Sequence, residues 1–168
     1  MVPDFFMDNN FKITVETPIG YIELTTNHDF LLSVSFTDIY LQSSGYQPNI
    51  LIETVRQIGE YFTGALKEFN LNLQPAGTDF QIKVWEQVIK VPYGETVSYL
   101  EIAKRTGSKS NTRAIGMANG KNPIPIIIPC HRVIGTNGKL TGYAGGLDRK
   151  KWLLNHEKQF MGFSYLLF

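Results

Sequence analysis

Hydrophobic and polar positions alternate differently in the two halves of the chain. Residues 11–26 contain two runs rich in β-branched and aromatic side chains, "FKITVET" and "YIELTT", around Pro18-Ile19-Gly20. This pattern predicts a β-hairpin, and "FLLSVSF" at 30–36 predicts a third strand. Near-helical spacing then predicts a helix over 49–64 that stops at Gly64. The apolar positions of that helix are Ile50, Val55, Ile58 and Phe62.

The second half is mostly of helical pattern. "LNLQPAGT" indicates a linker, so the boundary between the two parts is predicted at residues 77 and 78. A helix is then expected to begin at Thr78, as its N-cap, and to end before Pro92 and Gly94. Its predicted apolar stripe consists of Phe80, Val84 and Val88, joined by Trp85 and Ile89.

Two shorter helices follow, with the spacing of a helix-turn-helix. "SYLEIAKRTG" has Ser98 and Glu101 spaced as a capping box, and Gly107 ends it. "SNTRAIGMANG" is expected to begin at Ser110 as its cap. Such a pair is common in small helical proteins and does not by itself imply DNA binding.

The second helix of this pair is unusually rich in small residues. Arg113 is its only charge, and its small residues are Ala114, Gly116, Ala118 and Gly120. Small side chains permit close approach to another helix or to a nucleic-acid groove. Each helical glycine costs about 0.5–1 kcal/mol relative to alanine, which favours a function beyond packing. A helix pressed into a groove, with Arg113 reaching inward, fits this composition.

The charge is unevenly distributed along the 168 residues. The net charge is +1, but residues 1–77 hold 3 Lys or Arg against 9 Asp or Glu, and residues 78–168 hold 13 against 6. The halves therefore carry −6 and +7. This asymmetry is typical of a protein whose basic half meets a polyanion, although two oppositely charged surfaces that attract each other would give the same numbers.

Several protein classes are excluded by composition. The first ten residues lack the basic and apolar regions of a secretory signal. The longest apolar run, "IPIIIP", is too short and too rich in proline to cross a bilayer, so no membrane association is expected. A single cysteine excludes an intramolecular disulfide. The default expectation is a cytoplasmic protein, or a nuclear one if the host is eukaryotic.

That cysteine, Cys130, lies in "IPIIIPCHRVIG" between Pro129 and His131. A lone cysteine is usually a small buried apolar residue. A neighbouring histidine can instead activate it as a thiolate nucleophile. If the segment is a strand, consecutive side chains point to opposite faces, which favours contact through water. Glu157 is a candidate carboxylate for such a relay.

These residues resemble a known family. "PCHRVIG", the preceding "RAIGMANGKNPIPIIIPCHR" and the following "GYAGG" are similar to the O6-alkylguanine-DNA alkyltransferases, over residues 78–157. The resemblance implies an α/β (α+β) protein. Residues 1–77 would form a small ribonuclease-H-like α/β domain, and residues 78–168 a mostly helical DNA-binding and alkyl-acceptor domain.

The resemblance also implies a reaction. The alkyl group would move from O6 of guanine in double-stranded DNA to Cys130, irreversibly and once per molecule, after the damaged base is flipped out of the duplex. The protein would be a stoichiometric methylated-DNA–protein-cysteine methyltransferase that acts as a monomer, binds the minor groove and needs no cofactor.

Individual positions inherit expected roles from the family motif. Arg113 would fill the space left by the flipped base, and Tyr99 would assist flipping and hydrogen-bond the base. His131 and Glu157 would form a Cys–water–His–Glu relay. The carbonyl groups of Cys130 and Val133 would accept the exocyclic amine of guanine. The remaining expected positions are Tyr143 and Ala144 beside the base, and Asn122, which would brace the turn before the cysteine.

The chain departs from its relatives at two points. Some relatives have serine where Ala144 stands, which leaves the alkyl-size preference open. Others hold a structural zinc through cysteines in the first half, where this chain has none, and His28, His131 and His156 lack zinc-ligand spacing, so no metal is expected.

Three alternative functions stay open at this point. A non-catalytic alkyl-lesion sensor is one, although such relatives lack the cysteine. A cysteine hydrolase would use the Cys–His pair but leave Arg113 and the basic half unexplained. A transcription regulator would usually need a second regulatory domain or a dimer.

Overall fold

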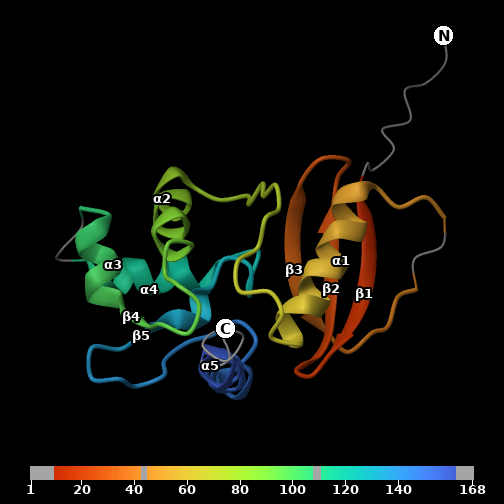
Figure 1. Ribbon diagram of the computed structural model, residues 1–168. Helices are drawn as coiled ribbons and strands as arrows, with labels where there is room; N and C mark the ends of the chain where they lie inside the picture. Colours follow the sequence, from red (N-terminus) through yellow and green to blue (C-terminus); the bar gives the residue numbers. More distant parts are fainter. Residues whose placement is uncertain (1–9, 43–44, 108–110, 162–168) are drawn as a thin grey trace, which may run out of the picture.

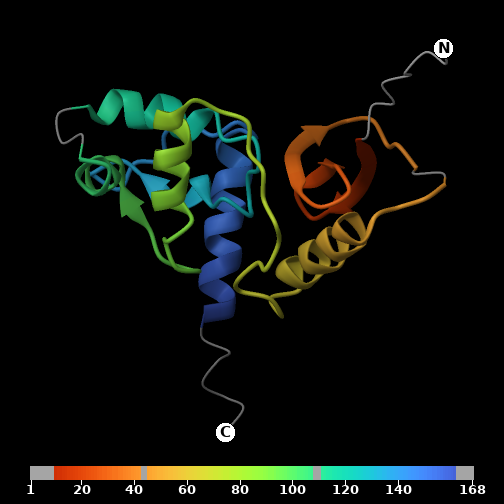
Figure 2. The ribbon, with the colours of Figure 1, turned by 90° about the horizontal axis from the view of Figure 1, so that it is seen from above.

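The computed structural model describes residues 10–42, 45–107 and 111–161, which form two lobes (Figure 1). The N-terminal lobe contains a three-stranded antiparallel sheet in the order β1-β2-β3. Its strands are β1 (Phe11–Thr17), β2 (Gly20–Thr26) and β3 (Leu31–Thr37). Helix α1 (Asn49–Phe62) lies across one face of the curved sheet, as Figure 2 shows from above.

The predicted hairpin and third strand are both confirmed. Thr17 pairs with Gly20, whose φ of 101° is a left-handed conformation that favours glycine. The predicted helix is also present, and Ile58 of its predicted stripe is fully buried, but the most buried face is rotated from the predicted one. Ile50 and Phe62 lie at the edge of that face, which centres on Leu51, Thr54, Ile58 and Tyr61.

The predicted linker is partly structured. Leu73 forms a parallel bridge with Leu31 at the start of β3. The Leu31 N–H donates to the Asn72 carbonyl (2.8 Å), and the Gln74 N–H donates to the Leu31 carbonyl (2.9 Å). The chain therefore runs along the edge of the sheet before it enters the second lobe.

The C-terminal lobe is mostly helical. Its helices are α2 (Asp79–Val88), α3 (Tyr99–Arg105), α4 (Thr112–Gly120) and the long α5 (Leu147–Met161). Two short parallel strands, β4 (Val97–Ser98) and β5 (Val133–Ile134), connect distant segments, and the 3-10 turn η1 (Cys130–Arg132) precedes β5. This combination of an α/β lobe and a helical lobe confirms the predicted fold class.

The N-caps predicted for the helices of this lobe are observed at Thr78 and Ser98, but two details differ. Thr78 caps α2 in a full capping box with Gln81. Ser98 caps α3, but the Glu101 side chain interacts with Arg105 and does not return the second capping bond. Ser110 lies outside the described residues, and Asn111 caps α4 by accepting from the Ala114 N–H (3.2 Å). The stripe of α2 is narrower than predicted, because Phe80 and Ile89 are 37% and 46% exposed.

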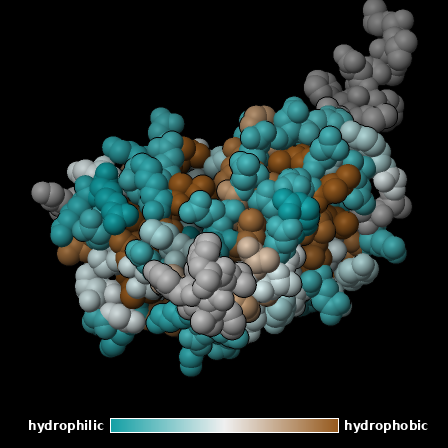
Figure 3. Space-filling model, viewed as in Figure 1, coloured by the Kyte–Doolittle hydropathy of each residue, from teal (hydrophilic) through white to brown (hydrophobic). Residues whose placement is uncertain are grey.

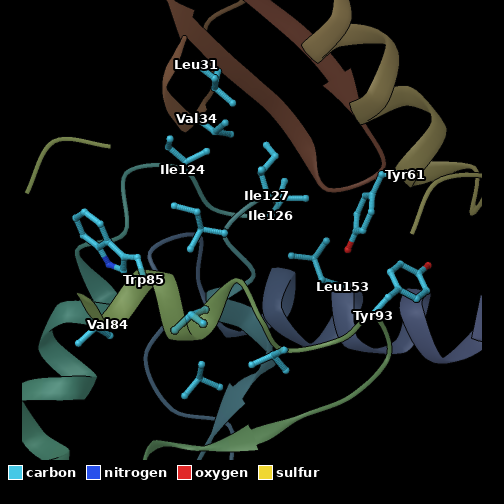
Figure 4. Packing of buried hydrophobic residues seen from close by; sticks show 14 of the residues in the cluster. Leu31, Val34, Tyr61, Val84, Trp85, Tyr93, Ile124, Ile126, Ile127 and Leu153 are labelled. Atoms are coloured by element: carbon cyan, nitrogen blue, oxygen red, sulfur yellow. The ribbon is translucent and has the colours of Figure 1, made fainter. Parts of the chain in front are cut away.

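One hydrophobic core runs through both lobes. Leu31 and Val34 of β3 face Ile124 and Ile127 of the C-terminal lobe (Figure 4). The Val34 N–H also donates to the Pro123 carbonyl (2.9 Å), so β3 holds the segment that leads to Cys130. On the face shown in Figure 3, hydrophilic residues cover most of both lobes, and hydrophobic residues lie between them. Among the described residues, no helix is long and apolar enough to cross a membrane.

Candidate active site

The segment before Cys130 is shaped by prolines. Pro123, Pro125 and Pro129 lack the N–H that strand pairing needs, and Cys130 lies in the 3-10 turn η1. The expected strand at Cys130 and His131 is therefore wrong, since β5 begins only at Val133. Within the same segment Ile126 has φ 76°, a left-handed conformation that β-branched residues seldom adopt. Such strain is concentrated at functional sites.

Asn122 braces this segment from within. Its Nδ2 donates to the Ile128 carbonyl (2.7 Å), and its Oδ1 accepts from the Ile124 N–H (3.0 Å). The side chain is buried, so both bonds are shielded from water. This geometry is compatible with the bracing role expected for Asn122.

The Cys130 thiol is in its neutral form at physiological pH. The residue is 3% exposed, and burial raises the pKa of the thiol to about 11. Hydrogen bonding from Asn122 and the nearby charge of Lys150 act in the opposite direction but do not overcome burial. A reaction that needs the thiolate must therefore supply a base at the moment of attack.

Glu157, on α5, is surrounded by hydrogen-bond donors. Oε1 accepts from the Tyr61 hydroxyl (2.8 Å) and from Arg132 Nη2 (3.0 Å), and lies 2.7 Å from His131 Nε2. Oε2 accepts from Arg132 Nε (3.0 Å) and the Gly94 N–H (2.9 Å). Burial alone would raise the pKa of Glu157, but His131 and Arg132 outweigh it and hold the pKa far below its usual range. Glu157 is therefore a buried carboxylate.

This environment fixes the tautomer of His131. Because the Glu157 carboxylate can only accept, His131 Nε2 carries the proton and Nδ1 carries the lone pair. Burial lowers the pKa of His131, against the effect of Glu157, so the ring is neutral. Nδ1 is buried and has no partner among the described residues. The site therefore holds a neutral imidazole with a free acceptor, directly beside a protonated thiol in sequence.

Two cationic residues of this site were not singled out from the sequence. Arg132 is 6% exposed and its Nη1 also donates to the Val91 carbonyl (2.6 Å). Lys150 is fully buried, and its Nζ donates to the carbonyls of Val133 (2.7 Å) and Thr141 (2.9 Å). Burial lowers the pKa of Lys150 to about 8. The arginine of "PCHR" was a visible signal for the first, but no local pattern distinguished Lys150 from its neighbour Lys151.

A cavity of about 550 Å³ opens beside α4. It brings together Tyr99, Arg113 and Met117 with the loop between Gly135 and Gly142. Arg113 is exposed at the start of α4, and the Tyr99 hydroxyl donates to the Thr141 carbonyl (3.3 Å). Met117, one turn after Arg113, is 61% exposed. The cavity thus joins two residues expected to handle the base.

The two glycines of α4 are not required by packing inside the protein, whereas Ala118 is buried in the core. A Cβ placed on Gly120 would meet nothing within 4 Å, and one on Gly116 would only touch the Tyr99 ring at 3.9 Å. The face of α4 that carries Gly116 and Gly120 is therefore open on the outside. This favours the interpretation that something external approaches it.

The loop after the cavity holds the last two expected residues. Ala144 is exposed, whereas the Tyr143 ring lies 6.5 Å from the His131 ring and 6.0 Å from Phe36 of β3. The Tyr143 hydroxyl is buried with no partner among the described residues. Phe36 also lies against Gly145, where a Cβ would come within 2.5 Å of its ring. Phe36 of the N-terminal lobe therefore packs directly against this loop.

In the described part of the chain, no group of three or more His, Cys, Asp or Glu side chains could hold a metal ion. His156 lies in an aromatic cluster, stacked on Trp152 at 4.8 Å. His28 is likewise in contact with the rings of Phe11 and Tyr46.

Comparison with known proteins places this site in a family. Residues 10–75 match the 6-O-methylguanine DNA methyltransferase ribonuclease-like domain, and residues 79–159 match the DNA-binding domain of the same name. The chain is 45% identical over 159 residues to a methylated-DNA–protein-cysteine methyltransferase of Mycolicibacterium paratuberculosis, covering 92% of this chain and 96% of that protein. It is 46% identical over 151 residues to the protein of that name from Methanosarcina acetivorans, covering 84% and 94%.

Solved structures agree with the sequence relatives. The Mycobacterium tuberculosis O6-methylguanine methyltransferase superposes with a TM-score of 0.80 at 44% identity, covering 89% of this chain and 93% of that one. A structure of Mycobacterium tuberculosis OGT in complex with DNA has a TM-score of 0.81 at the same identity and coverage. These matches span both lobes and include the segment that carries Cys130. The chain therefore belongs to the 6-O-methylguanine DNA methyltransferase family.

Proposed function

We propose that this protein repairs DNA by direct reversal of alkylation, taking the alkyl group of O6-alkylguanine onto Cys130 once per molecule. The observation that carries the proposal is a buried thiol beside a neutral histidine whose free acceptor and fixed tautomer suit proton removal. The names of the relatives support the same reaction.

The chemistry balances without a co-reactant. The thiol proton passes to His131 Nδ1 through water, because the thiol and ring form no direct bond among the described contacts. The sulfur attacks the alkyl carbon, the carbon–O6 bond breaks, and its electrons stay with guanine, which takes up a proton. Glu157 stabilises the imidazolium that forms. The product is a thioether with no simple route back to thiol, so each molecule reacts once.

DNA would reach this site by base flipping. A base inside a duplex cannot contact a thiol that is 3% exposed, and extrusion costs a few kcal/mol of unstacking. Arg113 would fill the vacated position while α4 lies in the minor groove. The exposed Arg113, the open face of α4 at Gly116 and Gly120, and the adjoining cavity support this assignment.

Recognition of the flipped guanine would use backbone acceptors and the loop. The Cys130 carbonyl already accepts from Asn119 (3.2 Å) and the Val133 carbonyl from Lys150. The Cys130 carbonyl also accepts from the Val133 N–H, so the exocyclic amine would displace or share one of its two donors. The Val133 carbonyl keeps a second lone pair beside the bond from Lys150. Tyr99 would donate to the leaving base. Tyr143 and Ala144 would line the base, with alanine offering only its backbone N–H for contact.

Cellular context follows from the same groups. One chain supplies every residue named here, which supports action as a monomer on double-stranded DNA. A free thiol that must stay reduced suits the cytoplasm, or the nucleus in a eukaryote. The boundary between the two domains would lie between residues 77 and 78, directly before the N-cap of α2.

The decisive experiment uses a duplex with one O6-methylguanine. Protein mixed with excess duplex is expected to gain one methyl group on Cys130, by mass analysis, and then stop. Cys130→Ala is expected to bind DNA and transfer nothing. Binding without methylation would favour the lesion sensor, and sustained turnover of an ester would favour the hydrolase. Sequence-specific binding to undamaged DNA as a dimer would favour a regulator.

A second experiment separates flipping from chemistry. Arg113→Ala is expected to slow methyl transfer from duplex DNA greatly and transfer from free O6-benzylguanine much less, because the free base needs no extrusion. Arg113→Lys should recover only part of the rate, since an ammonium does not stack as a planar guanidinium does. Equal slowing on both substrates would contradict the assignment of Arg113.

A further inference from the structure

Tyr61 connects the N-terminal lobe to the carboxylate of the active site. It is the penultimate residue of α1 and is fully buried. Figure 4 shows its hydroxyl pointing away from α1, toward the C-terminal lobe where Tyr93 and Leu153 lie. The hydroxyl donates to Glu157 Oε1 over 2.8 Å, across 96 residues of sequence. Of the donors described around Glu157, this is the one that comes from the N-terminal lobe.

The position of that bond matters because Oε1 is the oxygen that meets His131 Nε2 (2.7 Å). Arg132 binds both carboxylate oxygens, at 3.0 Å each, and its charge attracts the whole group. Without the Tyr61 hydroxyl, only His131 would oppose the pull of the Arg132 charge at Oε1, and that charge favours rotation of the carboxylate toward the guanidinium. The Tyr61 hydroxyl opposes that rotation, because it approaches Oε1 from another lobe.

The hydroxyl is also locked in the donating role. Burial first, and then the charge of Glu157, raise the pKa of Tyr61 well above its ordinary value, so the phenol stays neutral. Its backbone is anchored as well, because the Tyr61 carbonyl accepts from His156 Nε2 (2.8 Å). The ring lies within 6.0 Å, centroid to centroid, of Phe69, Tyr93 and His156. The side chain therefore has little freedom to leave Glu157.

We propose that Tyr61 is a positioning residue of the alkyl-transfer site, supplied by the N-terminal lobe, which holds the Glu157 carboxylate in line with His131. The inference rests on the proposed function and deepens it. It assigns the N-terminal lobe a direct part in the chemistry, beyond packing. The alternative is that Tyr61 only helps to dock the two lobes.

The matched pair of variants is Tyr61→Phe and Phe62→Leu. The first removes one hydroxyl and keeps the ring. The second changes a neighbouring aromatic residue at the contact between the lobes, because the Phe62 ring packs against the rings of Trp152 and His156 but not against Glu157. We expect Tyr61→Phe to slow alkyl transfer about tenfold, and Phe62→Leu to leave it within about twofold.

Two substrates and one reagent then locate the defect. Tyr61→Phe should slow transfer from methylated duplex and from free O6-benzylguanine by the same factor, unlike Arg113→Ala. Iodoacetamide, which needs only the thiolate, should also react more slowly with Cys130 in Tyr61→Phe near pH 7.5. Iodoacetamide tests the positioning role of Tyr61 even if the wild-type protein takes no alkyl group from guanine. That failure of transfer would overturn the proposed function but not the role of Tyr61.

The pH profile distinguishes positioning from docking. The charged or titratable groups facing the thiol and relay are Lys150, Arg132, Tyr61, Tyr93 and Tyr143. As the pH rises toward the Cys130 pKa of about 11, hydroxide forms the thiolate directly and the relay matters less. The ratio of wild-type to Tyr61→Phe rates should therefore fall between pH 7 and 10. A docking defect would give the same ratio at every pH.

A double-mutant cycle completes the test. In a Glu157→Gln background, Tyr61→Phe should change the iodoacetamide rate by less than about twofold, because the carboxylate it positions is gone. The proposal is overturned if Tyr61→Phe reacts like wild type, if Phe62→Leu is equally slow, or if the two substitutions act additively.

Discussion

Replacement of Arg132 by methionine tests the electrostatic argument for Glu157 most directly. Methionine has a similar length and no charge, so it removes the cation from a buried carboxylate while leaving most of the volume filled. Three bonds are lost, two to Glu157 at 3.0 Å each and one to the Val91 carbonyl at 2.6 Å. Tyr61, His131 and Gly94 remain around the carboxylate, but none of them is a permanent cation.

The expected magnitude follows from burial. Removing one partner of a buried ion pair costs about 3–5 kcal/mol, because the other charge is left without compensation. In a domain of this size each kcal/mol lowers Tm by roughly 2–4 °C, so a fall of about 6–20 °C is expected. Arg56→Met is the matched control. Arg56 interacts with Glu53 and Glu60 on the exposed side of α1, where water screens the charges, and little change is expected there.

The pH dependence has a defined sign. In wild type the pKa of Glu157 is lowered on folding, so its stabilisation is complete above the unfolded value near 4.5 and is lost as the pH falls toward the lower folded value. In Arg132→Met the folded pKa rises, because the cation is gone. The stability deficit should therefore be largest near pH 7 and shrink as the pH falls through 4.5.

The assay is urea unfolding of wild type, Arg132→Met and Arg56→Met between pH 4 and 7, followed by fluorescence. A loss below about 1 kcal/mol for Arg132→Met, or a deficit equal to that of Arg56→Met, would refute the assignment of Arg132 as the counter-charge of a buried carboxylate. A deficit that grows at low pH would refute the ionised state of Glu157.

In native protein, the Cys130 thiol should react slowly with iodoacetamide at pH 7 and faster as the pH approaches 11. In urea the same rise in rate should be centred near pH 9. Identical pH profiles in the two conditions would contradict a raised pKa of Cys130. Thr78→Ala should lower the free energy of unfolding by about 1 kcal/mol, because it removes the capping box of α2, and Thr78→Ser should restore most of it. Met117→Ala should weaken binding to undamaged duplex, measured by fluorescence anisotropy, because this exposed side chain lies one turn from Arg113. The rate of alkyl transfer from free O6-benzylguanine should not change. A slower reaction with the free base would place Met117 in the base pocket.

The three strands of the N-terminal sheet, helices α1 to α4 and the candidate nucleophile could be anticipated because they have local signals. The hairpin is specified by Pro18-Ile19-Gly20, and α2 by the capping pattern at Thr78. Cys130 stands out because no other cysteine competes with it. Arg113 stands out as the single charge on a helix of small residues. In each case the deciding information lies within a few neighbouring positions.

Long-range features could not be anticipated from the same patterns. The predicted stripe of α1 included Phe62 and left out Tyr61, because tyrosine is polar at its tip and its partner lies 96 residues away. Lys150 and Lys151 are indistinguishable in sequence, yet α5 turns one into the core and the other to solvent. The 3-10 turn at Cys130 follows directly after Pro129, which has no N–H for strand pairing, and an alternation pattern does not capture this.

The continuity of the core across β3 and the segment from Ile124 to Ile127 has a consequence for folding. A chain whose lobes share one apolar interior gains that burial only when both are formed, so partial unfolding of either lobe exposes the other's side chains. The two lobes should therefore melt as one cooperative unit, with equal calorimetric and van't Hoff enthalpies. Each lobe therefore depends on the other to stay folded, although the two halves of the chain carry opposite net charge and form different secondary structure.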